Sequence, residues 1–452
     1  MGLSDLNFLF RFLPIFLILY FLCPVKYRNV VLCLSGILFC ALSSPAGAAV
    51  LCISITVNYV MTCLMDCRPR FLSGIGEKRC WRRAWLFMSL LFNVGLLCYY
   101  KYRADALPPG ISFYTFTLLS MDIDVFLRRE KPARNLMEAG AFAAMFPKLL
   151  SGPITAYSDL MEQIRRRKSS AKKIEYGLSL VIAGLSFKVL IADTVGILWH
   201  EIQTVGFESI STPLAWMGAA AYSTQLFFDF QGYSLMAVGL GCMLGFDLPR
   251  NFDHPYRSRS ISEFYRRWHI SLGRWFRDYL YIPLGGSRAG TVRTVFNLFT
   301  VWILTGIWHG ITWNFILWGL TLGFFIVLEK LCLGKFLQAH KLLSRLYVWF
   351  LIPLTWVVFA ITDLSGLGIY FTRLFPFWGE GIAVNPSDWI YHGRTYLGFF
   401  LAALAVSSPV ADTLWKKFWN TIIAKCILFI LFWICVYRIV NGLHNPFMYL
   451  GF

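Results

Sequence analysis

Long apolar runs separated by short polar segments recur along the whole chain. Runs that approach the ~20 residues needed to cross a bilayer, fully or in part, are residues 6–23, 30–42, 46–64, 84–100, 111–127, 176–199, 213–248, 295–328, 346–361, 396–410 and 422–440. Within a bilayer the backbone must satisfy its own hydrogen bonds, so such runs form helices. The pattern predicts an all-α, polytopic membrane protein with about 10–12 membrane-crossing helices.

Residues 136–157 interrupt this pattern. The segment is weakly apolar but contains Pro147, Lys148, Gly152 and Pro153, and it is too short and too broken for a clean span. Irregular backbone at membrane depth is tolerated only where protein or a water-filled cavity surrounds it. We therefore expect a re-entrant or interfacial element here.

Residues 249–293 form a second interruption, rich in arginine. Ser260 and Glu263 have the spacing of a capping box that opens a helix. An apolar stripe follows at intervals of three and four residues: Phe264, Trp268, Leu272, Trp275, Tyr279 and Ile282. Arginines occupy the opposite face, so the pattern predicts one basic amphipathic helix in the cytoplasmic interface, with His269 at the edge of the stripe.

Composition agrees with a membrane protein and gives no sign of separate domains. The chain is 57% hydrophobic and only 15% charged, whereas soluble domains carry about a quarter charged residues. With no internal repeat or low-complexity linker, we expect a single transmembrane domain over residues 1–452, in which spans in residues 1–100 precede a core in residues 100–452. The 12 cysteines lie mostly in apolar runs, so they indicate neither a metal site nor a disulfide framework.

The net charge of +18 follows the membrane topology. Most Lys and Arg residues lie in alternate loops, and the intervening loops, such as 201–212 and 363–391, contain few. This positive-inside pattern places both termini outside the cytoplasm. It also accounts for the basic charge without nucleic acid, which we do not expect as a partner. The first apolar run lacks a clean cleavage site before Lys26, so we expect an uncleaved span.

Residues 295–328 contain a single titratable side chain, His309. A proton-exchanging group inside a membrane segment is a functional-site hypothesis by default, and imidazole is well suited to proton transfer near neutral pH. The alternative is a buried histidine satisfied by a backbone carbonyl. Gly306 and Gly310 permit a bend beside it, and we expect the helix to bend there and continue.

Asp229 is a second polar residue in an apolar run, and it must be paired or hydrogen-bonded there. Lys188, Tyr233 or an arginine of the basic helix are the candidate partners. A structural pairing explains Asp229 better than a direct role in a reaction. Lys188 and Asp193, five residues apart, are also expected to be a structural pair.

Several motifs in one order resemble the membrane-bound O-acyltransferase (MBOAT) family, in its bacterial alginate O-acetylation branch. They begin with 110–114 (GISFY), Asp124 and 151–153 (SGP), and continue through 227–234 (FFDFQGYS), 248–252 (LPRNF), 262–271 (SEFYRRWHIS), 275–286 (WFRDYLYIPLGG) and 306–310 (GIWHG). The resemblance runs from about residue 100 to the C-terminus. The first hundred residues match only in hydrophobicity.

The resemblance implies a helical funnel with a tunnel, built from membrane-crossing, re-entrant and interfacial helices. The two signature histidines map onto His269 and His309, of which His309 corresponds to the essential one. His309 would act as the base that activates a hydroxyl, and His269 would orient a substrate or His309 itself, or else anchor the interface. Trp308, Trp313 or Asn314 would stabilise the oxyanion.

The C-terminal residues 445–452 are aromatic, and related acyl-transfer systems carry similar tails. Tyr449 is the matching candidate for an acyl relay, and simple anchoring in the membrane interface is the alternative.

The implied function is transfer of an acyl group across a bacterial inner membrane, with acetyl as the first choice of acyl group. The donor would be a cytoplasmic thioester, acetyl-CoA or an acyl carrier protein, and the acceptor a hydroxyl of an extracytoplasmic polysaccharide or of a partner acetyltransferase. Apart from this co-substrate and surrounding membrane lipid, no bound cofactor or metal is expected. D-alanyl transfer to teichoic acid is the alternative, followed by a lipid acyltransferase or a non-enzymatic transporter. A transporter more often shows an inverted repeat.

Overall fold

The chain is helical throughout its described part. The computed structural model describes residues 1–67, 75–103, 107–288, 290–378, 383–443 and 447–448. It is 80% helical, and the described residues contain no strand. The all-α fold predicted from the apolar runs is therefore confirmed.

Two compact units make up the structure: residues 1–181 with 233–250, and residues 182–232 with 251–448. Two of the boundaries fall inside helices, in α9 (Ala171–Ser186) and α11 (Thr212–Met243). Each unit is described by itself below.

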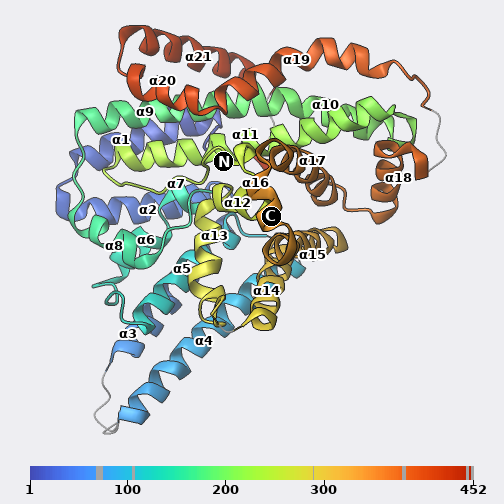
Figure 1. The fold of residues 1–452 in the computed structure, drawn as a ribbon. Coiled ribbons are helices and arrows are strands. Elements are labelled where there is room, and N and C mark those ends of the chain that lie inside the picture. Colours follow the sequence, from blue (N-terminus) through green and yellow to red (C-terminus); the bar gives the residue numbers. More distant parts are fainter. Residues whose placement is uncertain (68–74, 104–106, 289, 379–382, 444–446, 449–452) are drawn as a thin grey trace. The chain divides into compact units, whose positions relative to one another are not determined.

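The first unit holds the N-terminal helices (Figure 1). These are η1 (Phe8–Phe12), α1 (Leu13–Leu22), η2 (Val25–Tyr27), α2 (Arg28–Ala41), α3 (Pro45–Asp66), α4 (Ile75–Tyr102), α5 (Ile111–Phe126), α6 (Leu136–Ala143), α7 (Phe146–Leu149) and α8 (Tyr157–Arg166). Buried polar side chains join three of them. Asn93 of α4 donates to Asn58 of α3 over 2.6 Å, and Ser89 of α4 donates to Asp122 of α5 over 2.5 Å. These hydrogen bonds offset the desolvation cost of burying the polar side chains.

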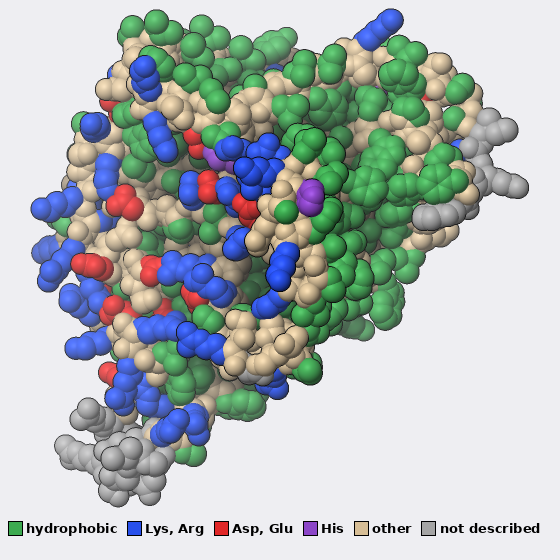
Figure 2. All heavy atoms as spheres, in the orientation of Figure 1, with side chains coloured by type: hydrophobic (Ala, Val, Ile, Leu, Met, Phe, Trp, Pro, Cys, Tyr) green, Lys and Arg blue, Asp and Glu red, His purple; other side chains and the backbone are tan. Residues whose placement is uncertain are grey.

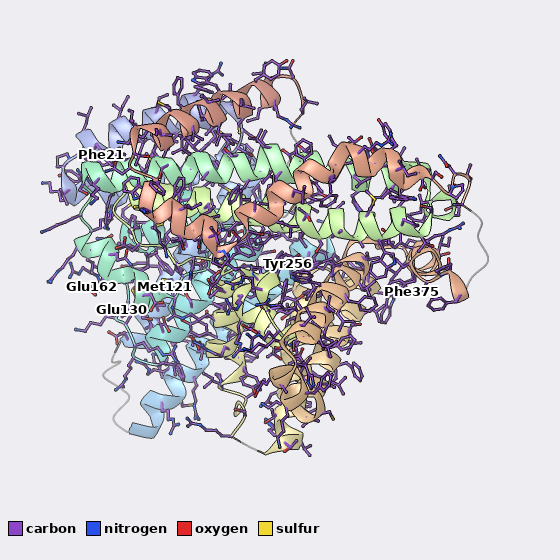
Figure 3. The ribbon with its side chains drawn as sticks, turned by 45° about the horizontal axis from the view of Figure 1, so that its top comes forward. Phe21, Met121, Glu130, Glu162, Tyr256 and Phe375 are labelled. Carbon is purple, nitrogen blue, oxygen red and sulfur yellow. The ribbon has the colours of Figure 1, made fainter. Side chains whose placement is uncertain are left out.

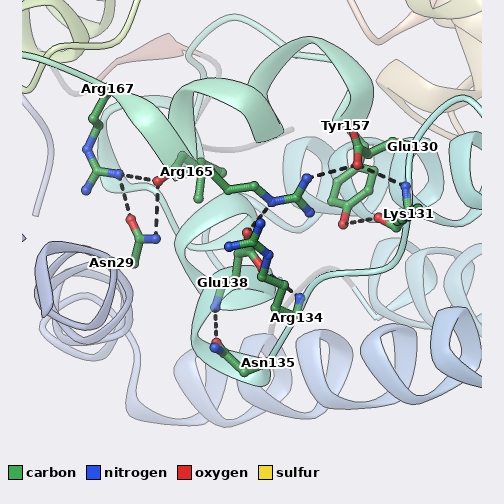
Figure 4. A network of polar contacts seen from close by, with 10 residues as sticks. Asn29, Glu130, Lys131, Arg134, Asn135, Glu138, Tyr157, Arg165 and Arg167 are labelled. Atoms are coloured by element: carbon green, nitrogen blue, oxygen red, sulfur yellow. Dashed lines mark hydrogen bonds and ion pairs between the residues drawn. The ribbon is translucent and has the colours of Figure 1, made fainter. Parts of the chain in front are cut away.

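The interruption expected at residues 136–157 is present as the short helices α6 and α7, followed by α8. Asn135 caps α6 by accepting from the Glu138 amide. Arg165 of α8 then bridges two carboxylates, at 2.6 Å from Glu138 and 3.0 Å from Glu130, and the Tyr157 hydroxyl donates to a nearby backbone carbonyl (Figure 4). This network holds together a segment too irregular to be stabilised by helix hydrogen bonds alone.

The second unit contains the remaining helices. They are η4 (Phe187–Ala192), α10 (Asp193–Val205), η5 (Phe207–Ser209), η6 (Pro255–Arg257), α12 (Ile261–Arg267), α13 (Ile270–Phe276), η7 (Arg277–Tyr281), α14 (Thr291–His309), α15 (Trp313–Leu328), η8 (Glu329–Leu333), α16 (Gly334–Ala339), α17 (Lys341–Ala360), α18 (Leu364–Leu374), η9 (Pro376–Trp378), α19 (Asp388–Val406), α20 (Pro409–Phe418) and α21 (Ile422–Val440).

Eight helices within the described residues are long and apolar enough to cross a membrane, or nine if the bent pair α19 and α20 counts as one span. This polytopic arrangement agrees with the expected class, but the number is below the expected 10–12. The difference arises because several apolar runs form shorter helices, such as α2 with 14 residues and α5 with 16. Large apolar side chains stay exposed on the long helices, for example Leu404 of α19 and Ile430 of α21, as lipid contact requires.

The sequence predicted one helix over residues 295–328 that bends near His309 and continues. In the structure the chain instead reverses direction there. Helix α14 ends at His309, Gly310 is extended, and α15 begins at Trp313. Glycines let the two helices approach closely: a Cβ on Gly306 would lie 2.4 Å from the Phe315 carbonyl oxygen. Small residues at such contacts are the usual means of close packing between membrane helices.

Replacing Gly306 by alanine is expected to destabilise the protein by about 1–3 kcal/mol, because the added carbon meets backbone that cannot move aside. The matched control is Gly398→Ala in α19, where an added Cβ meets nothing within 4 Å and helix propensity favours alanine. Thermal unfolding in detergent compares the two. Equal midpoints for both variants would contradict the close approach of α14 and α15.

Candidate active site

His309 closes α14 inside a box of aromatic rings. Its ring centroid lies 4.7 Å from Trp308, 5.2 Å from Trp318 and 5.0 Å from Phe359. These rings come from α14, α15 and α17, so the α14–α15 turn and one further helix position the imidazole. His309 is 6% exposed, so its side chain is largely shielded from solvent but not completely enclosed. Electrostatic interactions with the imidazole are therefore only weakly screened by water.

Asn314 fastens this box. Its amide donates to the Phe359 carbonyl over 2.9 Å and accepts from the Thr312 hydroxyl over 2.6 Å. These bonds place Asn314 in support of the box. Trp313, in contrast, is 70% exposed and points away from the interior. Of the three oxyanion donors considered from the sequence, Trp308 is the one whose ring lies directly against His309.

His269 lies at a break in the predicted amphipathic helix, and the expectation of one continuous helix was wrong. The chain forms α12 and α13, and His269 between them has φ +44° and ψ 54°, in the left-handed region. Asn251 holds the break: its carbonyl accepts from the Ile270 amide over 2.9 Å, and its side chain accepts from the Ser271 amide over 3.3 Å. A non-glycine residue in this region is uncommon and is concentrated at functional sites.

The capping box that opens α12 was predicted correctly. The Ser260 hydroxyl accepts from the Glu263 amide over 3.0 Å. Glu329 adds a second cap, accepting from the amides of Ile261 and Ser262. The His269 side chain that follows this helix is 4% exposed, and burial lowers its pKa to about 3. Imidazole at this position is therefore neutral at physiological pH.

The two histidines border one aromatic cluster of the second unit. The ring of His269 lies 4.6 Å from Phe230, and that of His309 lies 5.2 Å from Trp318. Between them the cluster runs through Phe252, Trp268 and Trp356, with neighbouring centroids 4.9 to 5.9 Å apart. Phe264 stacks on Trp268 at 5.5 Å, and Tyr256, labelled in Figure 3, lies 5.3 Å from Phe264. The cluster gives both imidazoles an apolar, aromatic setting.

Asp229 is paired with Lys188, one of the three partners considered. The Lys188 ammonium lies 2.8 Å from Asp229 and 2.5 Å from Asp193, and all three side chains are buried. The π-helical segment η4 brings Lys188 and Asp193 together, because a π-turn aligns residues five apart. This buried triad joins η4 and α10 to α11.

The same triad holds the C-terminal tail. The Met448 amide donates to Asp229 over 2.9 Å. The neighbouring Phe447 is 5% exposed and lies 6.2 Å from Phe230, the ring that contacts His269. Tyr449, the candidate relay residue, lies outside the described residues.

Two features near the site were missed from the sequence. Arg257, Arg259, Arg267 and Arg345 converge with Glu263 on a pocket of about 220 Å³. His254, the second non-glycine residue of this region with positive φ, lies 3.0 Å from Asp412. The arginines were already visible as part of the basic loops, but nothing in their spacing indicates that they meet.

A lysine in the first unit was also missed. Lys148 is 3% exposed, donates to the Thr155 hydroxyl over 3.0 Å and lies 4.1 Å from the Phe142 ring centroid. Burial lowers its pKa to about 7. The signal was present, since a lysine within an apolar stretch is unusual, but the sequence analysis used it only to mark irregular backbone.

Known proteins similar to this chain establish its family. The model of MBOAT, the membrane-bound O-acyltransferase family, matches residues 83–362. The chain is 34% identical to a probable alginate O-acetylase AlgI from Pseudomonas putida, with both chains covered in full. It is 30% identical to a peptidoglycan O-acetyltransferase from Helicobacter pylori, over 79% of this chain and 76% of that protein. A teichoic acid D-alanyltransferase from Bacillus subtilis is also 30% identical, over 47% and 56%.

The chain therefore belongs to the membrane-bound O-acyltransferase family. The resemblance drawn from its motifs is confirmed, and the protein is an O-acyltransferase.

Proposed function

We propose that the protein transfers an acetyl group from a cytoplasmic thioester to a hydroxyl of an envelope polysaccharide, or of a partner protein, on the outer side of a bacterial inner membrane. The observation that carries this proposal is His309, an imidazole held by three helices in an apolar box. The names of the relatives, a probable alginate O-acetylase and a peptidoglycan O-acetyltransferase, support the acetyl group and the polysaccharide.

In the proposed reaction His309 acts as general base. The acceptor hydroxyl loses its proton to the imidazole while its oxygen attacks the thioester carbonyl carbon. The carbon–sulfur bond then breaks, and the imidazolium returns the proton to the departing thiolate. Trp308 is the candidate donor to the developing oxyanion. His269, which is neutral, orients donor or acceptor from the other side of the aromatic cluster.

The direction of transfer rests on the charge pattern. The positive-inside pattern supports a cytoplasmic location for the basic segments and an extracytoplasmic location for both termini. The donor then enters from the side of α12. D-alanyl transfer is the second candidate, supported by the similarity to a teichoic acid D-alanyltransferase over about half of the chain.

A transfer assay with the purified protein tests the proposal. The protein in detergent is incubated with radiolabelled acetyl-CoA, acetylated carrier protein or D-alanylated carrier protein, together with alginate or peptidoglycan fragments. We expect label to move from an acetyl donor to the polysaccharide or to the protein's C-terminal peptide. Label on that peptide, abolished by Tyr449→Phe but not by Tyr437→Phe in the exposed part of α21, supports the relay. Transfer from the D-alanyl donor alone contradicts the acetyl assignment.

A further inference from the structure

The arginine pocket of the second unit is built from three separate segments. Arg257 ends η6, Arg259 precedes α12, Glu263 and Arg267 lie on α12, and Arg345 lies near the start of α17. Figure 2 shows Lys and Arg side chains gathered over this part of the unit, around α12 and α17. The pocket of about 220 Å³ is smaller than the ~300–1,000 Å³ of a typical small-molecule cleft. It therefore fits one charged part of a ligand.

The one carboxylate in the pocket is already engaged. Glu263 lies 2.9 Å from the Arg267 guanidinium and also accepts from the Arg259 backbone amide over 2.9 Å. Arg267 has a further carboxylate, Asp253, at 3.6 Å. The acidic side chains here thus balance Arg267 and the start of α12.

Three guanidinium groups are left to face the pocket. Within the described part of the chain, no carboxylate lies at ion-pair distance from Arg257, Arg259 or Arg345. Converging like charges repel one another, and a bound anion with several oxygens relieves that repulsion. Guanidinium groups match phosphate in particular, because their planar fork donates two parallel hydrogen bonds.

The position of the pocket indicates what carries the phosphate. Helix α12 leads from the pocket to His269, two residues beyond its end. Helix α17 leads from Arg345 to Phe359, the ring against His309. The separation of 14 positions between Arg345 and Phe359 corresponds to about 21 Å at 1.5 Å per residue. A pantetheine arm, with two amide units and a cysteamine end, is a chain of comparable length.

The charge pattern adds a second argument. All five pocket residues belong to the basic segments 250–293 and 329–345, which the positive-inside pattern assigns to the cytoplasm. Coenzyme A and acyl carrier proteins are cytoplasmic, and both join their thioester to phosphate through pantetheine. Lipid headgroup phosphate shares the charge but offers no thioester to the histidines.

We propose that the arginine pocket binds the phosphate groups of the acyl-pantetheine donor and so directs its thioester toward the aromatic cluster. This inference rests on the proposed acyl-transfer function. Arg257, Arg259 and Arg345 are donor-binding residues in this proposal, and Glu263 keeps Arg267 and α12 in place.

Competition binding tests the pocket without any need for turnover. Tritiated coenzyme A is bound to the full-length protein in detergent, and unlabelled phosphopantetheine or pantetheine is added. We expect phosphopantetheine to compete. Pantetheine, which lacks phosphate, should compete at least about tenfold more weakly, because losing one charge-assisted hydrogen bond lowers the affinity about tenfold or more. The double variant Arg257→Gln with Arg345→Gln should lose this discrimination. Arg266→Gln, an exposed arginine of α12 outside the pocket, is the matched control and should keep it.

Kinetics separate the two sources of phosphate and the two proposals. With acetyl-CoA the double variant should raise KM by about tenfold or more and leave kcat nearly unchanged. With S-acetyl-N-acetylcysteamine, a thioester without phosphate, it should behave like the wild type. Unchanged coenzyme A binding and KM, with weaker binding to vesicles of anionic lipid, would overturn the inference in favour of a lipid site. Coenzyme A binding that depends on the arginines, without transfer, would contradict the proposed function but support the pocket.

Discussion

Replacing His309 by alanine is expected to reduce acyl transfer by at least about a hundredfold, the smallest usual contribution of a positioned general base. The hydroxyl acceptor would then have to lose its proton without an imidazole, beside the apolar rings of Trp308, Trp318 and Phe359. The loss should appear in kcat and in kcat/KM together, because proton transfer takes part only in the transition state. Initial rates of label transfer from the donor measure it.

Two further variants guard this result against a folding defect. His309→Gln keeps polar hydrogen-bonding atoms and much of the volume but has no basic nitrogen, so it should fold and remain inactive. His200→Ala, at an exposed position of α10, is the matched control and should transfer at the wild-type rate. Activity of His309→Gln close to that of the wild type would remove the base assignment.

Of the two histidines, His269 should contribute no titration to the pH dependence of the reaction. A general base works in its deprotonated form, so the rate falls as the pH drops through the pKa of that base. Burial lowers the pKa of His269 to about 3, so His269 does not change charge between about pH 5 and 8. A titration of activity in that range that disappeared in a His269 variant would contradict this division of roles.

Much of the architecture was predictable because lipid leaves the chain few choices. Apolar runs such as 422–440 have to form helices, and α21 spans the same residues as that run. His309 could be singled out for the same reason, since a lone titratable group stands out against an apolar background. The reversal of the chain after it could not be predicted, because Gly310 is equally compatible with a bend.

The break at His269 lay beyond a sequence argument. The apolar stripe from Phe264 to Ile282 has helical spacing across the break, so local periodicity favours one helix. What ends α12 is a tertiary contact: Asn251, from a loop earlier in the chain, accepts hydrogen bonds from the amides of Ile270 and Ser271. The hydrogen bond between Met448 and Asp229 likewise joins positions 219 residues apart. No pattern within either segment predicts it.

Replacing Lys188 by methionine is expected to destabilise the protein by about 3–5 kcal/mol, the usual cost of breaking a buried ion pair. Lys188 lies between Asp193 and Asp229, at 2.5 and 2.8 Å. Its removal leaves two buried carboxylates without their shared cation, and they must then take up protons or admit water. Thermal unfolding in detergent, together with the yield of folded protein, measures the effect.

Graded variants separate charge from packing in this triad. Asp229→Asn should cost less than Lys188→Met, because Lys188 keeps Asp193 and the amide oxygen can still accept from Met448. Asp247→Asn, which removes an exposed ion pair with Lys173, should cost no more than about 1 kcal/mol. Asp229→Ala, which removes the acceptor of the Met448 amide, should loosen the tail, so carboxypeptidase should remove C-terminal residues faster, as mass spectrometry can follow. If Lys188→Met unfolds at the same temperature as Asp247→Asn, the triad contributes nothing to stability and the pairing has another purpose.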